Sequence, residues 1–265
     1  MAKTSPTAVL TIAGSDPSGG AGIQSDLGVF SYLGLHGLSV ITAVTAQNTR
    51  GVQRVFPLGR DHVSAQLESV AADFRPAVSK TGMLPTVDII EEVSQISSRG
   101  QLGKLVIDPV LVSTSGVRLA ADECTYYLMR NLLPQCSLVT PNLFEAEMLS
   151  GRSIRTEQDA MEAARALVGA GAGSACVTGG HWPGNPVDFV FDGQIMHKFE
   201  GQRISTASPV HGTGCVFSSA AAAYLARGFT VAAAVENAKI LVERAINGAI
   251  SPASGMMLPS LLPDK

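Results

Sequence analysis

The sequence has few aromatic and few charged residues. Aromatic residues make up 5% of the 265 positions and charged residues 15%, whereas hydrophobic residues make up 46%. We therefore expect a core of small aliphatic side chains, which suits close packing of helices on a sheet. The formal net charge is −3, so the chain offers no basic surface for a phosphate backbone. Nucleic acid is not an expected partner.

The chain also lacks paired cysteine motifs and long apolar runs. Its four cysteines show no CxxC spacing, which favours reduced thiols over a zinc site or a disulfide framework. Their positions are Cys124, Cys136, Cys176 and Cys215. The longest stretch of low polarity, Val216–Ala223, is too short to cross a bilayer, and Ala8–Ala13 is too short for a signal peptide. These features predict a cytoplasmic protein with no membrane partner.

Short apolar runs alternate with segments of helical spacing along most of the chain. This alternation predicts a doubly wound α/β fold with a mostly parallel sheet. The expected strands are Ala8–Ala13, Val40–Val44, Val78–Met83, Leu105–Val112 and Ser137–Thr140. The expected helices are Ile23–Leu33, Asp61–Ala72, Val87–Ile96, Gly214–Ala226 and Thr230–Asn247.

One segment departs from this alternation. Asp188–Phe191 and Gln194–Phe199 flank Asp192-Gly193, which is typical of a tight β-hairpin. We expect this antiparallel pair at one edge of the sheet. The chain shows no linker and no repeat, so residues 1–265 are interpreted as one domain.

Ligands of open α/β sheets bind beyond the carboxyl ends of the strands, so the segments that follow each strand are examined first. Gly14–Gly22 is rich in glycine, but it is neither a GxGxxG nor a GxxxxGK[ST] motif. It is either a ligand-binding loop or a flexible turn. Asp26 lies one helical turn further, where its carboxylate faces either the same pocket or solvent.

Two further strand ends carry groups that suit a ligand. The amide of Gln47, beside Asn48, offers a donor and an acceptor side by side, as the edge of an aminopyrimidine requires, although both are also ordinary loop residues. Asp108 is placed at the end of a predicted strand, where its carboxylate is suited to hydrated Mg²⁺, and Pro109 prevents a helix from starting there.

The segment after the next strand has a structural and a functional interpretation. Asn142 and Glu145 have the spacing of a capping box, with Asn142 as N-cap and Glu145 at the third helical position. Capping needs no catalytic role, and the two roles are compatible.

His211-Gly212-Thr213-Gly214-Cys215 precedes a predicted helix. Gly-Thr-Gly at a helix start leaves several N–H groups unpaired, which suits a phosphate. We expect this nest to hold a transferring phosphoryl group and the helix start to lower the pKa of the Cys215 thiol, which then acts as a base. The alternative is a small buried cysteine after a structural turn.

Together these segments resemble the ribokinase-like superfamily, and within it the hydroxymethylpyrimidine/phosphomethylpyrimidine kinases of thiamine biosynthesis. The resemblance implies one α/β/α domain, usually in a homodimer, that uses ATP and Mg²⁺ to phosphorylate 4-amino-5-hydroxymethyl-2-methylpyrimidine and then its monophosphate. It is carried by Thr11–Leu27, Val40–Gln53, Lys80–Leu84, Val106–Gly116, Leu138–Leu149 and His211–Cys215.

The resemblance also implies roles for individual residues. The pyrimidine is expected to contact Gly14, Asp26, Gln47 and Met83. Four residues are expected at the nucleotide and its phosphates, namely Asp108, Asn142, Glu145 and Thr178. Of these, Asp108 and Glu145 are expected to bind Mg²⁺ through water. Gly212, Thr213 and Gly214 are expected to form the anion hole, with Cys215 as the base.

Two departures from the family pattern remove positive charges. Where many members read VKGGH, this chain has Thr178 in place of the lysine, and where many read AKSG, it has Thr114. Threonine donates a hydrogen bond but supplies no point charge. Two other functions therefore remain open at this point: a pyridoxine or pyridoxal kinase, and a pyrimidine-binding regulatory protein without turnover.

Overall fold

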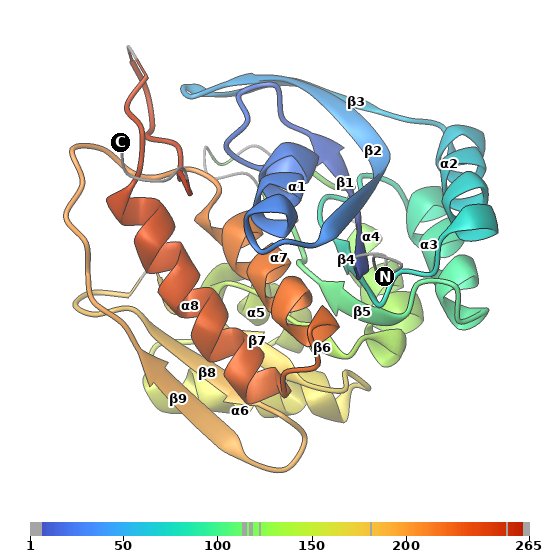
Figure 1. Ribbon diagram of the computed structural model, residues 1–265. Helices are drawn as coiled ribbons and strands as arrows, with labels where there is room; N and C mark the ends of the chain where they lie inside the picture. The colour runs from blue at the N-terminus through green and yellow to red at the C-terminus, as the bar shows by residue number, and fades with distance from the viewer. Residues whose placement is uncertain are drawn as a thin grey trace, which may run out of the picture.

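The computed structural model describes residues 7–112, 116, 119–121, 123–180, 182–252 and 254–261. Within these residues one nine-stranded sheet has the order β3-β2-β1-β4-β5-β6-β7-β8-β9 (Figure 1). Its strands are β1 (Ala8–Ser15), β2 (His36–Asn48), β3 (Gly51–Pro57), β4 (Val78–Thr81), β5 (Lys104–Ile107), β6 (Leu138–Val139), β7 (Ala175–Val177), β8 (Val187–Phe191) and β9 (Met196–Glu200). Its helices are α1 (Gly22–Tyr32), α2 (Arg60–Asp73), α3 (Val87–Ser98), α4 (Cys124–Tyr127), α5 (Leu143–Ser150), α6 (Glu157–Gly169), α7 (Thr213–Ala226) and α8 (Val231–Asn247). A π-helical segment (Leu128–Leu132) and a 3₁₀ turn (Leu133–Gln135) follow α4.

The centre of the sheet is parallel and both of its edges are antiparallel. Strands β2, β1, β4, β5, β6 and β7 pair in parallel, which confirms the predicted sheet. The hairpin of β8 and β9 is also present, with Gly193 at φ 95° in its turn. The opposite edge was not predicted: β3 runs antiparallel to β2. Strand β3 is mostly exposed, so its sequence lacks the apolar alternation that signals a half-buried strand.

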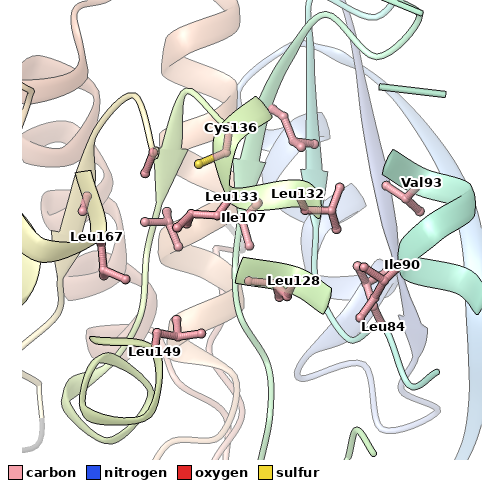
Figure 2. Close-up of a cluster of buried hydrophobic side chains, with 14 of the residues drawn as sticks. Leu84, Ile90, Val93, Ile107, Leu128, Leu132, Leu133, Cys136, Leu149 and Leu167 are labelled. Atoms are coloured by element: carbon pink, nitrogen blue, oxygen red, sulfur yellow. The ribbon is translucent and has the colours of Figure 1, made fainter. Parts of the chain in front are cut away.

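Helices cover both faces of the sheet, as the predicted three-layer fold requires. Figure 1 shows α1, α7 and α8 in front of the sheet, where they pack on one buried cluster that includes Val9 and Val106. The neighbouring strand residues Leu10 and Ile107 point to the opposite cluster, against the remaining helices (Figure 2). This alternation explains the apolar runs of the central strands, because both faces of each strand are buried.

Several predicted boundaries need correction. The strand expected over Leu105–Val112 ends at Ile107, because the N–H of Asp108 makes the last ladder bond, to the oxygen of Thr81, and Pro109 has no N–H. Strand β7 and helix α6 were not predicted. Helix α6 begins with a capping box of Thr156 and Asp159, a signal that the sequence does contain.

The glycine-rich loop is shorter than predicted, since Gly14 and Ser15 still belong to β1 and Gly22 already begins α1. Gly22 has φ 59°, and a Cβ atom there would lie 2.3 Å from the carbonyl oxygen of Gly14. Only glycine allows this approach. The loop therefore returns sharply over the end of β1, between β2 and β4, where the direction of chain winding reverses.

No helix in the described part of the chain combines the length and the apolar character that crossing a bilayer requires. All four cysteines carry free thiols, and Cys215 alone among them is partly exposed.

Candidate active site

A cavity of about 470 Å³ opens at the carboxyl ends of the parallel strands, between them and the helices α7 and α8. It brings together every residue of the predicted site except Asp26. Those lining it are Gly14, Gln47, Met83, Asp108, Asn142, Glu145, Thr178, Gly212, Thr213, Gly214 and Cys215. Residues from six strand ends and from the starts of α5 and α7 therefore share one space.

The start of α7 presents free backbone N–H groups to this cavity. Gly212 is the N-cap at φ 90°, where a Cβ atom would lie 1.8 Å from the carbonyl oxygen of Gly20, so only glycine fits. The first intrahelical bond is donated by the N–H of Val216. Among the described residues, no backbone acceptor takes the N–H groups of Thr213, Gly214 and Cys215. The nest is thus available to an anion.

The thiol of Cys215 reaches the cavity, but the predicted fall of its pKa is wrong for the ligand-free protein. Burial raises the pKa of the Cys215 thiol to about 12. Lys80 opposes this rise, whereas the carboxylates of Asp108 and Asp26 add to it. The helix start acts on the sulfur, but two buried carboxylates and the loss of water outweigh it.

Lys80 lines the cavity, and the sequence interpretation did not single it out as a site residue. Its side chain is 0% exposed, yet its ammonium borders the cavity. Nζ lies 3.0 Å from both carboxylate oxygens of Asp26 and 3.5 Å from Oδ2 of Asp108. Burial alone would lower the pKa of Lys80, but Asp26, Cys215 and Asp108 together hold it above its usual range, so the ammonium stays charged. A lysine in an otherwise buried parallel strand was the available signal.

Asp26 lies elsewhere than predicted. Its carboxylate faces neither the cavity nor solvent: it is 0% exposed, pairs with Lys80 and accepts a hydrogen bond of 2.6 Å from Oγ1 of Thr11. The carboxylate of Asp26 is therefore not placed to contact a pyrimidine in the cavity. Asp26 instead fixes the position of Lys80, which does reach the cavity.

Two carboxylates border the middle of the cavity. Asp108 accepts a hydrogen bond of 2.8 Å from Oγ of Ser218 on α7. Glu145 forms the predicted capping box with Asn142, each side chain accepting the other's backbone N–H at 3.0 Å. Burial, and then the neighbouring Asp108, raise the pKa of Glu145 to about 8. The site therefore concentrates negative charge that a cation would relieve.

The polar end of the cavity is built around Gln47. Gln47 and Asn48 were expected in a loop, but both belong to β2, which continues beyond Val44 to pair with β3. Nε2 of Gln47 lies 2.9 Å from Nε2 of His211, and Oε1 of Gln47 lies 3.2 Å from Oγ1 of Thr45. The amide is thus held from two sides.

Gly14 and Met83 close the space beside this amide. A Cβ atom at Gly14 would lie 2.5 Å from Cε of Met83, so the glycine lets the thioether pack against the end of β1. The pair forms an apolar wall next to a hydrogen-bonding edge, as a flat heterocycle requires.

The opposite end of the cavity lies between β8 and α8. Nζ of Lys239 is 2.7 Å from Oδ2 of Asp188, whose Oδ1 accepts the N–H of Gly179 at 3.0 Å. Thr178 lines this end and donates its N–H to the oxygen of Pro141. Thr114, the other departure from the family pattern, lies outside the described residues.

Comparison with known proteins assigns this arrangement to a family. The model of the phosphomethylpyrimidine kinase family matches residues 16–259. The chain belongs to this family. A hydroxymethylpyrimidine/phosphomethylpyrimidine kinase of Escherichia coli is 45% identical over 239 residues, which cover 89% of this chain and 90% of the relative. The chain is accordingly a kinase.

Solved structures agree in fold. A phosphomethylpyrimidine kinase from Clostridium difficile has a TM-score of 0.80 at 38% identity and covers 91% of this chain and 99% of its own. The ADP complex of a pyridoxal kinase from Bacillus subtilis has a TM-score of 0.89 at 37% identity, with 96% of this chain and 97% of its own covered. The ribokinase-like fold expected from the sequence is confirmed.

Proposed function

We propose that this kinase transfers the γ-phosphoryl group of ATP to 4-amino-5-hydroxymethyl-2-methylpyrimidine and then to the resulting monophosphate. The observation that carries the proposal is one cavity that holds both the bidentate amide of Gln47 and the free amides at the start of α7, beside Cys215. The first group suits an aminopyrimidine edge and the second suits a phosphoryl group. The E. coli relative named for both activities supports the substrate.

Residues of this chain account for the chemistry by position and charge. Gln47 orients the ring, with Gly14 and Met83 against its apolar face. The N–H groups of Thr213, Gly214 and Cys215 stabilise the charge that develops on the phosphoryl oxygens, and Lys80 adds a buried positive charge nearby. Lys80 thus supplies in part the charge that Thr178 and Thr114 do not.

Cys215 is proposed to receive the proton of the attacking hydroxyl. Because its thiol is neutral in the ligand-free protein, it must first lose its own proton. Lys80 and the N–H of Gly22 favour the thiolate, whereas burial and the carboxylates of Asp108 and Asp26 oppose it. A metal ion held at Asp108 would weaken the part of this opposition that comes from Asp108.

Asp108 and Glu145 are proposed to hold Mg²⁺, mostly through water. The residues present fit this ion, because Mg²⁺ is usually bound by one or two carboxylates together with water and substrate phosphates, and these two carboxylates are neighbours. A site with three or more His, Cys, Asp or Glu ligands is not found among the described residues. When bound, the ion neutralises phosphate charge. Asn142 and Thr178, at the same cavity, are proposed to contact the nucleotide, and the ADP complex of the B. subtilis relative supports ATP as the donor.

The test is a coupled assay of ADP release with the pyrimidine and ATP, followed by identification of the mono- and diphosphate products. Turnover of the aminopyrimidine supports the proposal. No turnover at millimolar substrate, from folded protein, contradicts it.

A pyridoxal kinase is the second candidate, because the B. subtilis structure with a TM-score of 0.89 carries that activity. Next to the hydroxymethyl group that accepts the phosphoryl group, pyridoxal carries a formyl group, which accepts a hydrogen bond, where the pyrimidine carries an amino group, which donates one. Pyridoxal therefore does not match both groups of the Gln47 amide in the same order. We therefore expect kcat/KM to favour the pyrimidine when both substrates are measured side by side.

We also propose that the chain forms a homodimer through the hairpin of β2 and β3. Val44 and Phe56 are cross-strand partners there, and they are 44% and 51% exposed. Two adjacent exposed apolar side chains on an edge hairpin suit a second copy of the same surface. Sedimentation of the wild type and of Phe56→Ser would test this, since a monomeric wild type excludes it.

A further inference from the structure

The amide of Gln47 is held by two side chains of different hydrogen-bonding character. His211, which is 8% exposed, contacts its Nε2, and Thr45 contacts its Oε1. Each contact uses one hydrogen-bonding position of the amide, so the oxygen keeps a second lone pair and the nitrogen a second N–H for a ligand in the cavity that Gln47 lines. The order of these two groups decides which heterocycle can pair with them.

Half a turn about the last side-chain bond of Gln47 reverses this order. In one arrangement the amide N–H donates to a bare Nε2 of His211 and the hydroxyl of Thr45 donates to the amide oxygen. In the other, Nε2 carries a proton and donates to the amide oxygen, while the NH₂ group donates to Thr45. The hydroxyl of Thr45 has one proton. It either donates this proton to the amide oxygen, or donates it to the carbonyl oxygen of Ser15, 3.0 Å away, and accepts from the NH₂ group.

His211 does not serve both arrangements at once, because an imidazole nitrogen is either a donor or an acceptor. Its proton is influenced by Asp16, whose Oδ2 lies 3.4 Å from the same Nε2. Asp16 is fixed by the N–H of Ser18 at 2.9 Å and by the N–H of Ala21 at 3.0 Å, so this carboxylate has a set place next to the ring. Whether Nε2 of His211 donates or accepts is thereby coupled to the order of donor and acceptor that Gln47 presents.

A 4-aminopyrimidine and a 4-oxopyrimidine require opposite orders. The amino form presents a bare ring nitrogen beside an N–H donor, whereas the oxo form presents a ring N–H beside an oxygen. We propose that His211 is the positioning residue that makes this site select a 4-aminopyrimidine over its 4-oxo counterpart, by holding the Gln47 amide in one orientation. The inference rests on the proposed function and goes beyond it, because it assigns the discrimination to a residue outside the amide itself.

The experiment measures calorimetric affinities for 4-amino-5-hydroxymethyl-2-methylpyrimidine and for the 4-oxo compound with the same substituents. For the wild type we expect a preference for the amino form of roughly 10–100-fold, as one bidentate pair provides. His211→Phe removes the contact, and His211→Gln replaces it with an amide that donates or accepts. Both variants are expected to reduce the preference to within about threefold, with affinity for the amino form better retained in His211→Gln.

Thr45→Val is the matched control. It removes the other contact to the same amide, that of a hydroxyl which turns to suit either order and favours one of them only through its bond to Ser15. It is therefore expected to weaken the binding of both compounds and to change the preference less than either histidine variant does.

A merely structural role of His211 would leave the preference intact in His211→Gln, and that result would overturn the inference. A wild type that binds both compounds alike would also overturn it, while turnover in the ADP-release assay would leave the proposed function standing. Binding of neither compound by the wild type would contradict both. Thermal melting identifies any variant that does not fold. If one of the two His211 variants does not fold, the preference measured for the other one tests the inference.

Discussion

Two buried lysine–aspartate pairs border the same cavity and differ in their surroundings. Lys80 and Asp26 join β4 to α1, whereas Lys239 and Asp188 join α8 to β8. Lys80 has a second carboxylate at 3.5 Å, whereas Asp188 uses its other oxygen for the N–H of Gly179. A thiol interacts electrostatically with each pair, Cys215 with the first and Cys176 with the second. The first pair is one part of a charged cluster, and the second is complete in itself.

This difference separates a pair that serves chemistry from a pair that serves packing. Buried ion pairs contribute little net stability compared with apolar residues of similar size, so their presence alone is weak evidence of a structural role. Around Lys80, two carboxylates and a thiol share one ammonium, which leaves an excess of negative charge for a cation to balance. Around Lys239 no such excess is seen in the described residues, so its ammonium is expected to anchor α8.

The largest expected effect concerns the thiol beside the first pair. Cys215→Ala should lower kcat by about 10²–10⁴, the range for loss of a general base. Because the pKa of the free thiol is raised to about 12, kcat/KM of the wild type should rise with pH through the measurable alkaline range, and Cys215→Ser should flatten this rise. Steady-state kinetics across pH check both statements. A near-normal kcat in Cys215→Ala would show that the thiol is not the base.

The next effect concerns Lys80 itself. Lys80→Met should lower kcat by about 10²–10³ through loss of a preorganised charge. It should also lower the free energy of unfolding by about 3–5 kcal/mol, because Asp26 is left buried without a partner. Urea denaturation and kinetics measure the two losses.

The double variant Asp26→Leu/Lys80→Met separates these losses. It removes both charges and is expected to recover most of the stability but none of the activity. Recovery of activity along with stability would show that Lys80 acts only on folding.

The sequence predicted the parallel sheet and most of the site because both depend on local signals. Apolar runs mark strands that are buried on both faces, and the residues after them meet at one edge of the sheet by topology alone. Gly212 and the capping box of Asn142 and Glu145 are likewise local, and both are present.

The predictions that were wrong depend on contacts between residues that are distant in the sequence. Asp26 and Lys80 are 54 positions apart, and each looked like an ordinary charged residue until the fold paired them. The change in the pKa of the Cys215 thiol was predicted with the wrong sign for the same reason: the helix start is local, whereas burial by the fold and the carboxylates of Asp108 and Asp26 are not. Strand β3 was missed because its exposed sequence lacks an apolar pattern.

A smaller effect concerns the carboxylate next to the Lys80 cluster. The pKa of Glu145 is raised to about 8, so the ligand-free protein must release a proton before the carboxylate can face Mg²⁺. Apparent Mg²⁺ affinity should therefore rise by about tenfold per pH unit below this value and level off above it. Glu145→Gln should remove the pH dependence, whereas Glu147→Gln on the same helix should retain it. Titrations at several pH values check this, and a pH-independent wild type would contradict it.

The same raised pKa fixes the sign of the effect on stability. Between the ordinary value of 4.5 and about 8 the folded protein binds a proton at Glu145 that the unfolded chain has released. Stability from this group is therefore complete below the lower value and is lost as pH rises to the upper one. Glu145→Gln should flatten this fall in denaturation experiments without metal.

The smallest effect on catalysis is expected at the second pair, and it is the strictest test of the comparison. Lys239→Met leaves Asp188 buried without its cation, so the free energy of unfolding should fall by about 3 kcal/mol, close to the loss in Lys80→Met. The kcat should nevertheless stay within about threefold of the wild type, because Lys239 lies at the β8–α8 end of the cavity, whereas Cys215 lies in the charge cluster of Lys80. Equal losses of stability with unequal losses of kcat would confirm that two chemically similar pairs have different tasks. A loss of kcat as large as that of Lys80→Met would show that both lysines act on the transferred phosphoryl group, since packing alone does not explain it.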